Sequence, residues 1–146
     1  MSREEAYVLD TSVIVRWFLA QSGWEHARKV RDQFLAGDVT VETVECARFE
    51  TPWVLRKRGL LPGHLTIDEY LAGCRGIDDL GVFVAPTDVD TIEQAAFLCT
   101  TRSIDFFDAI FVARALHSGR PVLTADARLA RGVGDLVPVV VLDGVA

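Results

Sequence analysis

The chain has 146 residues, 50% of them hydrophobic and 25% charged, so its composition indicates one globular domain and excludes a disordered protein. The formal net charge of -6 is atypical of proteins that coat nucleic acid, because such proteins are usually basic. No apolar run approaches the roughly 20 residues of a membrane span and residues 1–5 lack a signal-peptide apolar core, so we expect a cytoplasmic protein without membrane contact.

Apolar runs and helix-like segments alternate along the chain. The expected strands cover residues 6–9, 39–44, 82–84, 121–124 and 137–142, and Pro138 predicts an edge position for the last of them. The expected helices cover residues 13–19, 46–58, 88–100, 105–117 and 125–131, and capping boxes at Ser22/Glu25 and Thr66/Glu69 open two more, the first of which ends at Gly37. This alternation predicts a three-layer α/β/α domain over residues 1–146, with a mostly parallel central sheet.

Pro52 interrupts the helix expected at residues 46–58. An interior proline removes a hydrogen bond and clashes with the carbonyl group four residues earlier. Either the helix kinks near Arg48, or it begins late, with Pro52 in its first turn.

Three aspartates occupy positions that suit a shared site. Asp10 follows the first expected strand, and Asp126 follows the strand at 121–124. Asp108 lies on the apolar face of the helix at 105–117, where an unpaired carboxylate would be costly. Each aspartate alone could be only a helix cap, and Asp105 fits that role best. Because parallel strands bring their carboxyl ends to one edge, we expect Asp10, Asp108 and Asp126 to meet there.

A cluster of carboxylates suits hard divalent cations. Mg²⁺ and Mn²⁺ prefer oxygen ligands, and two such ions about 4 Å apart can activate water and stabilise the leaving oxygen of a phosphodiester. Other chemistries find less support. The histidines, His26, His64 and His117, have no zinc-site spacing, and Cys46, Cys74 and Cys99 are typical of scattered reduced thiols. Neither a GxSxG elbow nor a glycine-rich phosphate loop occurs.

Three fragments carry a resemblance to a known family. They are Val8-Leu9-Asp10-Thr11-Ser12-Val13, Phe107-Asp108-Ala109 ahead of an apolar helix, and Leu123-Thr124-Ala125-Asp126 ahead of Arg128-Leu129-Ala130. In this order and spacing the chain resembles the PIN-domain ribonucleases, and more closely the VapC-type toxins of bacterial toxin–antitoxin pairs. The resemblance covers nearly the whole chain and implies a single PIN-like domain.

The resemblance also implies the residues of the site. An acidic quartet that binds Mg²⁺ or Mn²⁺ would consist of Asp10, Glu50, Asp108 and Asp126, with Asp10, Asp108 and Asp126 as metal ligands. Glu45 competes with Glu50 for the second place, and Asp105 is a possible additional acid. Thr11, Ser12 and Thr124 would be supporting hydroxyls. The region around Glu50 departs from the family pattern, since the usual preceding proline is missing and Pro52 follows the glutamate.

The leading hypothesis is therefore a metal-dependent endoribonuclease toxin. Its implied partners are RNA, a cognate antitoxin and a second copy in a homodimer, with Arg16, Trp17 and Phe18 as plausible groove contacts or, for the two aromatics, ordinary core. Arg56, Lys57, Arg102 and Arg128 are candidates for holding the RNA backbone, whereas the basic face of Arg28, Lys29 and Arg31 is expected to be only solvated. The alternatives are an inactive PIN-fold interaction module, and a receiver-like signalling domain, which the missing late-strand lysine disfavours.

Overall fold

The structure is a computed structural model that describes residues 5–145. Residues 1–4 and Ala146 lie outside the described residues. The expectation that residues 1–5 lack a signal-peptide apolar core falls mostly on this N-terminal segment. Among the residues that are described, no helix combines the length and apolar character that crossing a bilayer requires.

Five strands form one sheet in which every described pair is parallel, in the order β3-β2-β1-β4-β5. The strands are β1 (Glu5–Leu9), β2 (Val39–Val44), β3 (Phe83–Ala85), β4 (Val122–Thr124) and β5 (Val139–Val141). The helices are α1 (Thr11–Phe18), α2 (Trp24–Leu35), α3 (Glu45–Leu55), the π-helical turn η1 (Arg56–Leu60), α4 (Ile67–Asp79), α5 (Val89–Thr101), α6 (Phe106–Ser118) and α7 (Ala127–Val133). The predicted α/β class is confirmed, and β5 lies at an edge as Pro138 suggested.

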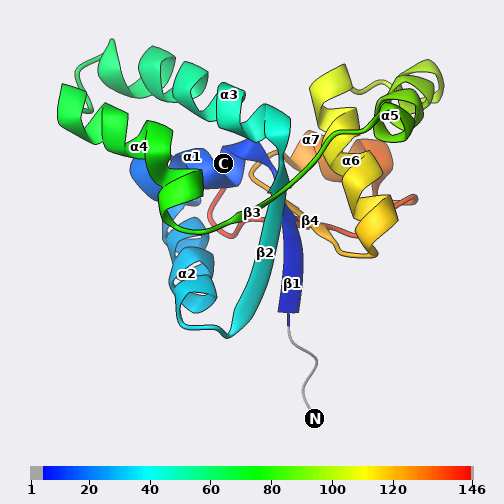
Figure 1. Cartoon of the computed structure of the whole chain (residues 1–146), viewed down its shortest axis with the longest axis horizontal. Helices are drawn as coiled ribbons and strands as arrows, with labels where there is room; N and C mark the ends of the chain where they lie inside the picture. The colour runs from blue at the N-terminus through cyan, green and yellow to red at the C-terminus, as the bar shows by residue number, and fades with distance from the viewer. Residues whose placement is uncertain (1–4, 146) are drawn as a thin grey trace.

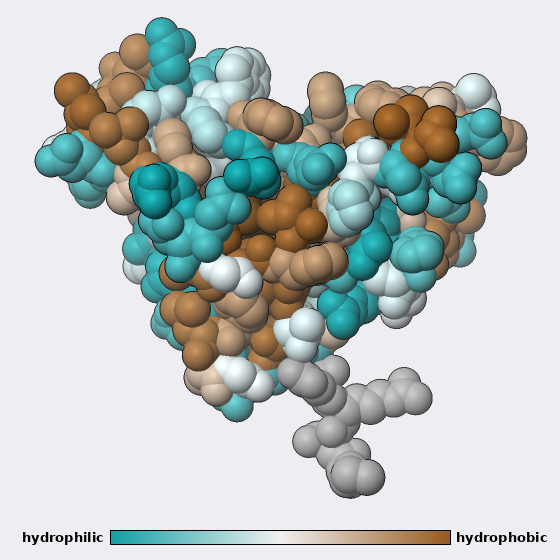
Figure 2. Space-filling view, in the orientation of Figure 1, coloured by the Kyte–Doolittle hydropathy of each residue, from teal (hydrophilic) through white to brown (hydrophobic). Residues whose placement is uncertain are grey.

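The helices form layers on either side of the sheet. Helix α1 packs on β1 and β4, and α2 to α4 lie around it, whereas α6 packs on β1, β2 and β4 and carries α5 (Figure 1). The outline of the molecule has two prominences, one formed by α3 and α4 and the other by α5 and α6, with a notch between them (Figure 2). Strands β1 and β2 run toward this notch.

The strand order places a topological switch point at the centre of the sheet. From β1 the chain builds outward through β2 and β3, and it then crosses to the opposite side of β1 to form β4 and β5. In the register of β1 with β4, Leu9 is paired with Leu123, so Asp10 and Thr124 follow at the same level. Ligands of open α/β sheets usually bind at such a point, beyond the carboxyl ends of the strands.

A buried ion-pair cluster fastens the α6 layer to the sheet. Glu42 of β2 is only 3% exposed, and its carboxylate accepts hydrogen bonds from Arg114 Nε at 2.8 Å and from Arg120 Nη1 at 3.0 Å. A buried carboxylate needs such partners, because desolvation of an unpaired charge is costly. The cluster joins β2 to α6, which carries Asp108, and to the segment that leads into β4, which ends at Thr124.

Two local expectations are wrong. Ser22 does not cap α2, which begins after Gly23; this glycine adopts a left-handed φ of 87°, and no side chain caps the helix. The carbonyl oxygen of Ser22 instead accepts a hydrogen bond from Arg16 Nε at 2.7 Å. The late start at Pro52 is also wrong, because α3 begins at Glu45 and continues through Pro52 into η1.

Candidate active site

Three helix N-termini meet beyond the carboxyl ends of β1 and β4. Their N-cap residues are Asp10 for α1, Asp105 for α6 and Asp126 for α7, and each carboxylate accepts a hydrogen bond from a backbone N–H of its own helix. The positive ends of helix dipoles stabilise negative charge. The capping role expected of Asp105 is confirmed, and Asp10 and Asp126 are caps as well as members of an acidic group.

Asp10 is held by two hydroxyl residues and by the backbone. It is 8% exposed, Thr124 Oγ1 donates to its Oδ2 at 2.7 Å, and the backbone N–H of Ser12 donates to its Oδ1 at 3.2 Å. Thr124 Oγ1 also accepts from the N–H of Asp126 at 3.0 Å, and Ser12 Oγ accepts from the N–H of Ala125 at 2.9 Å. These bonds connect the end of β1 with the turn that follows β4.

Glu50 reaches the same region from α3. Thr11 Oγ1 donates to its Oε1 at 3.2 Å, which fixes the carboxylate against the first turn of α1. Glu45 points elsewhere, since its Oε2 accepts from the N–H of Thr87 at 3.3 Å in the segment between β3 and α5. The structure therefore brings Glu50, and not Glu45, to the other acids.

The carboxylates line one hollow between α1, α3, α6 and α7, here called the acidic cleft. Its volume is about 240 Å³. The acids that line it are Asp10, Glu50, Asp105, Asp108 and Asp126, together with Thr11 and Ser12. A further hollow of about 240 Å³ continues along Asp105, Asp108 and Asp126 toward Arg128. The sheet and helices thus collect acids that are up to 116 residues apart in the sequence.

Burial and mutual repulsion oppose ionisation of these acids. Burial, followed by the negative charges of Asp10 and Asp105, raises the pKa of Asp108 to about 7. Burial also raises the pKa of Asp10, although the hydrogen bond from Thr124 counteracts it and the charge of Asp126 adds to it. The pKa of Glu50 is raised by burial and by the charges of Asp10 and Asp105. A cation in the cleft would relieve this repulsion.

The donor set fits a divalent metal ion in its chemistry. It consists of carboxylate oxygens with hydroxyl groups beside them, which are the ligands of Mg²⁺ and Mn²⁺. Within residues 5–145, however, no three acidic, histidine or cysteine side chains already converge on one point as a closed metal site. Several carboxylate oxygens accept cap hydrogen bonds, which orient the carboxylates without occupying all of their lone pairs.

The structure also places Arg58 at the cleft, which the sequence did not indicate, beside Arg16, which was expected as a groove contact. Arg16 and Arg58 both line it, and neither forms a salt bridge within the described chain. The Cys46 thiol lies against Glu50, and burial together with the Glu50 charge raises its pKa, so it is an unreactive thiol. Cys46 precedes Glu50 by four residues on one helix, and this spacing could have predicted that the two side chains are neighbours.

The four basic residues expected to hold RNA are either paired with a carboxylate or lie outside the acidic cleft. Arg102 forms a bidentate pair with Asp135, and Arg128 pairs with Asp126 at the rim. Lys57 lies over the Trp53 ring at 5.2 Å, and neither it nor Arg56 lines the acidic cleft. The expected core position of Trp17 is confirmed at 2% exposure.

Comparisons with known proteins agree with this architecture. The family model described as PIN domain matches residues 7–134. The solved structure of Mycobacterium tuberculosis VapC20, titled a Sarcin-Ricin loop cleaving toxin, is 19% identical, with a TM-score of 0.67 over 87% of this chain and 94% of that one. VapBC-5 of the same organism, a member of the VapBC family of toxin-antitoxin systems, is 26% identical, with a TM-score of 0.54 over 94% and 97%. No curated protein sequence matches the chain.

Proposed function

The chain belongs to the PIN domain family, and on that premise we propose that it is a divalent-metal-dependent endoribonuclease that hydrolyses RNA phosphodiesters. The observation that carries the proposal is the acidic cleft, where carboxylates from α1, α3, α6 and α7 share one hollow and where burial, together with the neighbouring negative charges, raises the pKa of Asp108. A protein gains nothing in stability from such repulsion, so a cationic ligand is its natural explanation.

We assign the roles residue by residue. Asp10, Asp108 and Asp126 would hold Mg²⁺ or Mn²⁺, which when bound supplies Lewis-acid activation of water and charge stabilisation at the phosphate. Glu50 or Asp126 would orient the attacking water and accept its proton. Thr11 and Thr124, which donate to Glu50 and Asp10, together with Ser12, would keep the carboxylates in place.

The likeness to VapBC-5 and the sequence resemblance together support a biological role. We propose that the protein is the toxin of a toxin–antitoxin pair and acts on RNA in the cytoplasm. Its partners would be a cognate antitoxin that blocks the acidic cleft and a second copy in a homodimer. Co-purification with the antitoxin and light scattering of the free protein would test these two partners.

The experiment for the nuclease proposal is cleavage of transfer, ribosomal and messenger RNA in Mg²⁺, in Mn²⁺ and in EDTA. We expect cleavage with either metal, none in EDTA, and at least a hundredfold loss in Asp10→Asn and in Asp126→Asn (about the cost of losing a main electrostatic group). Asp79→Asn is the matched control, because its carboxylate pairs with Arg75 on the exposed surface of α4. Cleavage that persists in EDTA would contradict the metal requirement.

The second candidate is a PIN-fold interaction module without nuclease activity. The observation that favours it is that no closed metal site is preassembled among the described side chains. A well-folded protein that neither binds Mn²⁺ nor cuts RNA would establish this candidate instead.

A further inference from the structure

The arginines of this acidic protein divide into two groups. Within residues 5–145, the arginines that pair with carboxylates are Arg31, Arg48, Arg75, Arg102, Arg114, Arg120 and Arg128. Those without a carboxylate partner are Arg16, Arg28, Arg56, Arg58 and Arg131. Arg16, Arg28 and Arg58 of this second group gather at two adjoining hollows. Unneutralised guanidinium groups in one place indicate a site for an anion.

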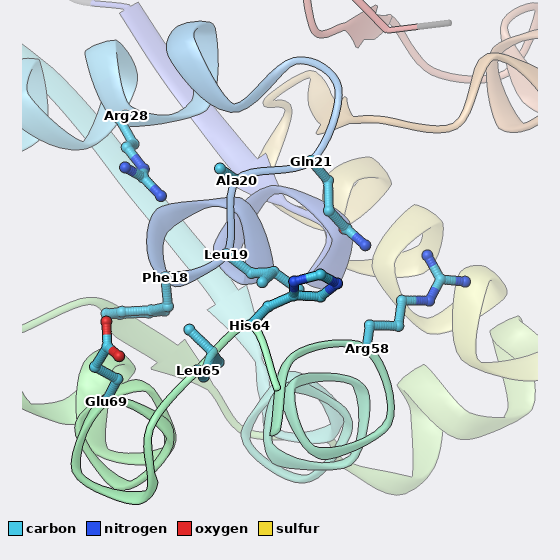
Figure 3. A pocket seen from close by; sticks show the side chains of 9 residues that line it. All are labelled: Phe18, Leu19, Ala20, Gln21, Arg28, Arg58, His64, Leu65 and Glu69. Atoms are coloured by element: carbon cyan, nitrogen blue, oxygen red, sulfur yellow. The ribbon is translucent and has the colours of Figure 1, made fainter. Parts of the chain in front are cut away.

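The hollow that Arg28 and Arg58 line is here called the Arg58 cavity, and its volume is about 460 Å³. It shares Gln21 and Arg58 with the acidic cleft, so the two hollows adjoin. Arg28 enters it from one side and Arg58 from the opposite side, and the His64 ring lies between them (Figure 3). This volume lies within the usual range for small-molecule sites of about 300–1,000 Å³.

Its walls are held in place by local structure. The backbone N–H groups of His64 and Leu65 both donate to the carbonyl oxygen of Gly59, at 2.8 Å and 3.0 Å. Arg28 Nε donates to the carbonyl oxygen of Arg16 at 3.1 Å, and its guanidinium lies 4.6 Å from the centre of the Trp24 ring. These contacts position the Arg28 guanidinium without neutralising it. The one carboxylate among the lining residues, that of Glu69, accepts a hydrogen bond from the N–H of Thr66 at 3.0 Å and forms no salt bridge with either arginine within the described chain.

The cavity also contains apolar surface and an unsatisfied polar atom. Leu19 and Leu65, which are 7% and 8% exposed, line it beside Phe18. Gln21 Oε1 is buried without a hydrogen-bond partner within the described chain, and such an acceptor normally has one. The cavity therefore offers cations for a phosphate, apolar side chains for a planar ring and an amide for a hydrogen bond.

We propose that the Arg58 cavity binds the nucleotide of a single-stranded RNA that adjoins the scissile phosphate in the acidic cleft. Arg58 and Arg28, on opposite sides of the cavity, would each contact a phosphate of the strand, and the base would pack on Phe18 and Leu65 beside Gln21. Single-stranded RNA suits this geometry because unpaired bases can turn into a cavity. The inference rests on the proposed function, since the cleft supplies the bond that is cut.

The test compares Arg58→Gln and Arg28→Gln with Arg131→Gln. Arg131 is a suitable control because it is exposed on α7, is also without a carboxylate partner among the described residues, and lines neither hollow. All three variants lose one positive charge, so a general electrostatic effect would be equal among them. Circular dichroism melting checks that Arg28→Gln folds, and Arg58→Gln breaks no hydrogen bond of the described chain.

Two readouts separate the cavity from the nuclease chemistry. The first is the ratio of kcat/KM for an RNA oligonucleotide to kcat/KM for bis(p-nitrophenyl) phosphate, a diester without nucleotides. We expect this ratio to fall about fivefold to tenfold in both cavity variants and to stay constant in Arg131→Gln. The second is anisotropy of a labelled RNA in EDTA, where we expect the salt dependence of binding to decrease by about one phosphate contact.

Each outcome decides one of the two proposals. If every variant cleaves both substrates with the same ratio of kcat/KM values as the wild type, the cavity proposal is overturned and the nuclease proposal stands. Cavity-dependent binding without cleavage would support the cavity and overturn the nuclease. A wild-type protein that neither binds RNA in EDTA nor cuts it with either metal overturns both, and an acidic protein segment then becomes the better occupant.

Discussion

Asp108 is the residue whose ionisation the acidic cleft opposes most clearly, because its pKa is raised to about 7. The unfolded chain ionises this carboxyl near its ordinary pKa of 3.8, so the folded state binds the proton more tightly. The contribution of Asp108 to the free energy of unfolding is therefore fully present below pH 4, and it is lost as the pH rises toward and through 7. We expect Asp108→Asn to stabilise the metal-free protein by about 1–2 kcal/mol at pH 8, a figure reduced for solvent screening.

Thermal melting in EDTA from pH 4 to pH 8 measures this effect. The gap in melting temperature between Asp108→Asn and the wild type should widen with pH and nearly close at pH 4. Saturating Mn²⁺ should then stabilise the wild type more than the variant. A gap that does not change with pH would show that repulsion in the cleft does not control the protonation of Asp108.

Thr124 connects two acids of the cleft through one hydroxyl group. Its Oγ1 donates to Asp10 and accepts from the N–H of Asp126. We expect Thr124→Val to weaken Mn²⁺ affinity about tenfold or more, the usual cost of losing a group that orients a metal ligand. Thr43→Val is the control, since its buried hydroxyl donates to the carbonyl of Leu9 instead of a carboxylate. Calorimetric titration that finds equal affinities in both variants would remove Thr124 from this role.

At the scale of elements, a glycine allows α4 to approach α1. A Cβ atom added to Gly76 would overlap the ring of Phe18, whereas at Gly132 in α7 the nearest atom, Ile104 Cγ2, would be 3.5 Å away. We expect Gly76→Ala to destabilise the fold by about 1–3 kcal/mol through overpacking. Gly132→Ala should be neutral or stabilising by up to about 1 kcal/mol, because alanine favours a helix. Urea denaturation of both variants distinguishes these effects, and equal changes would contradict the close packing.

Local sequence patterns predict some helix starts and ends of this chain and miss others. The Thr66 capping box is present because its pattern is local to one turn. The Ser22/Glu25 pattern fails because Gly23 supplies a left-handed turn that no side-chain spacing reveals. The helix expected at residues 46–58 is present and continues through Pro52, but no sequence pattern indicates that its last turn, η1, is π-helical.

At the scale of the whole molecule, the site could be predicted in outline. Strand ends and the apolar helix face predict that Asp10, Asp108 and Asp126 approach one another, because a parallel sheet collects its carboxyl ends. The choice of Glu50 over Glu45 needs the orientation of α3 on α1. The position of Arg58 and Gln21 at the cleft depends on contacts between distant segments, which no periodic pattern in the sequence indicates.

The proposed nuclease function depends on the acidic cleft being a metal centre. The most direct measurement is isothermal titration of Mn²⁺ and Mg²⁺ into the wild-type protein and into an Asp10→Asn/Asp108→Asn double variant. We expect saturable binding to the wild type, and none to the double variant although it remains folded. A wild type that binds neither ion, or a double variant that binds both unchanged, would contradict the account and leave these carboxylates as helix caps.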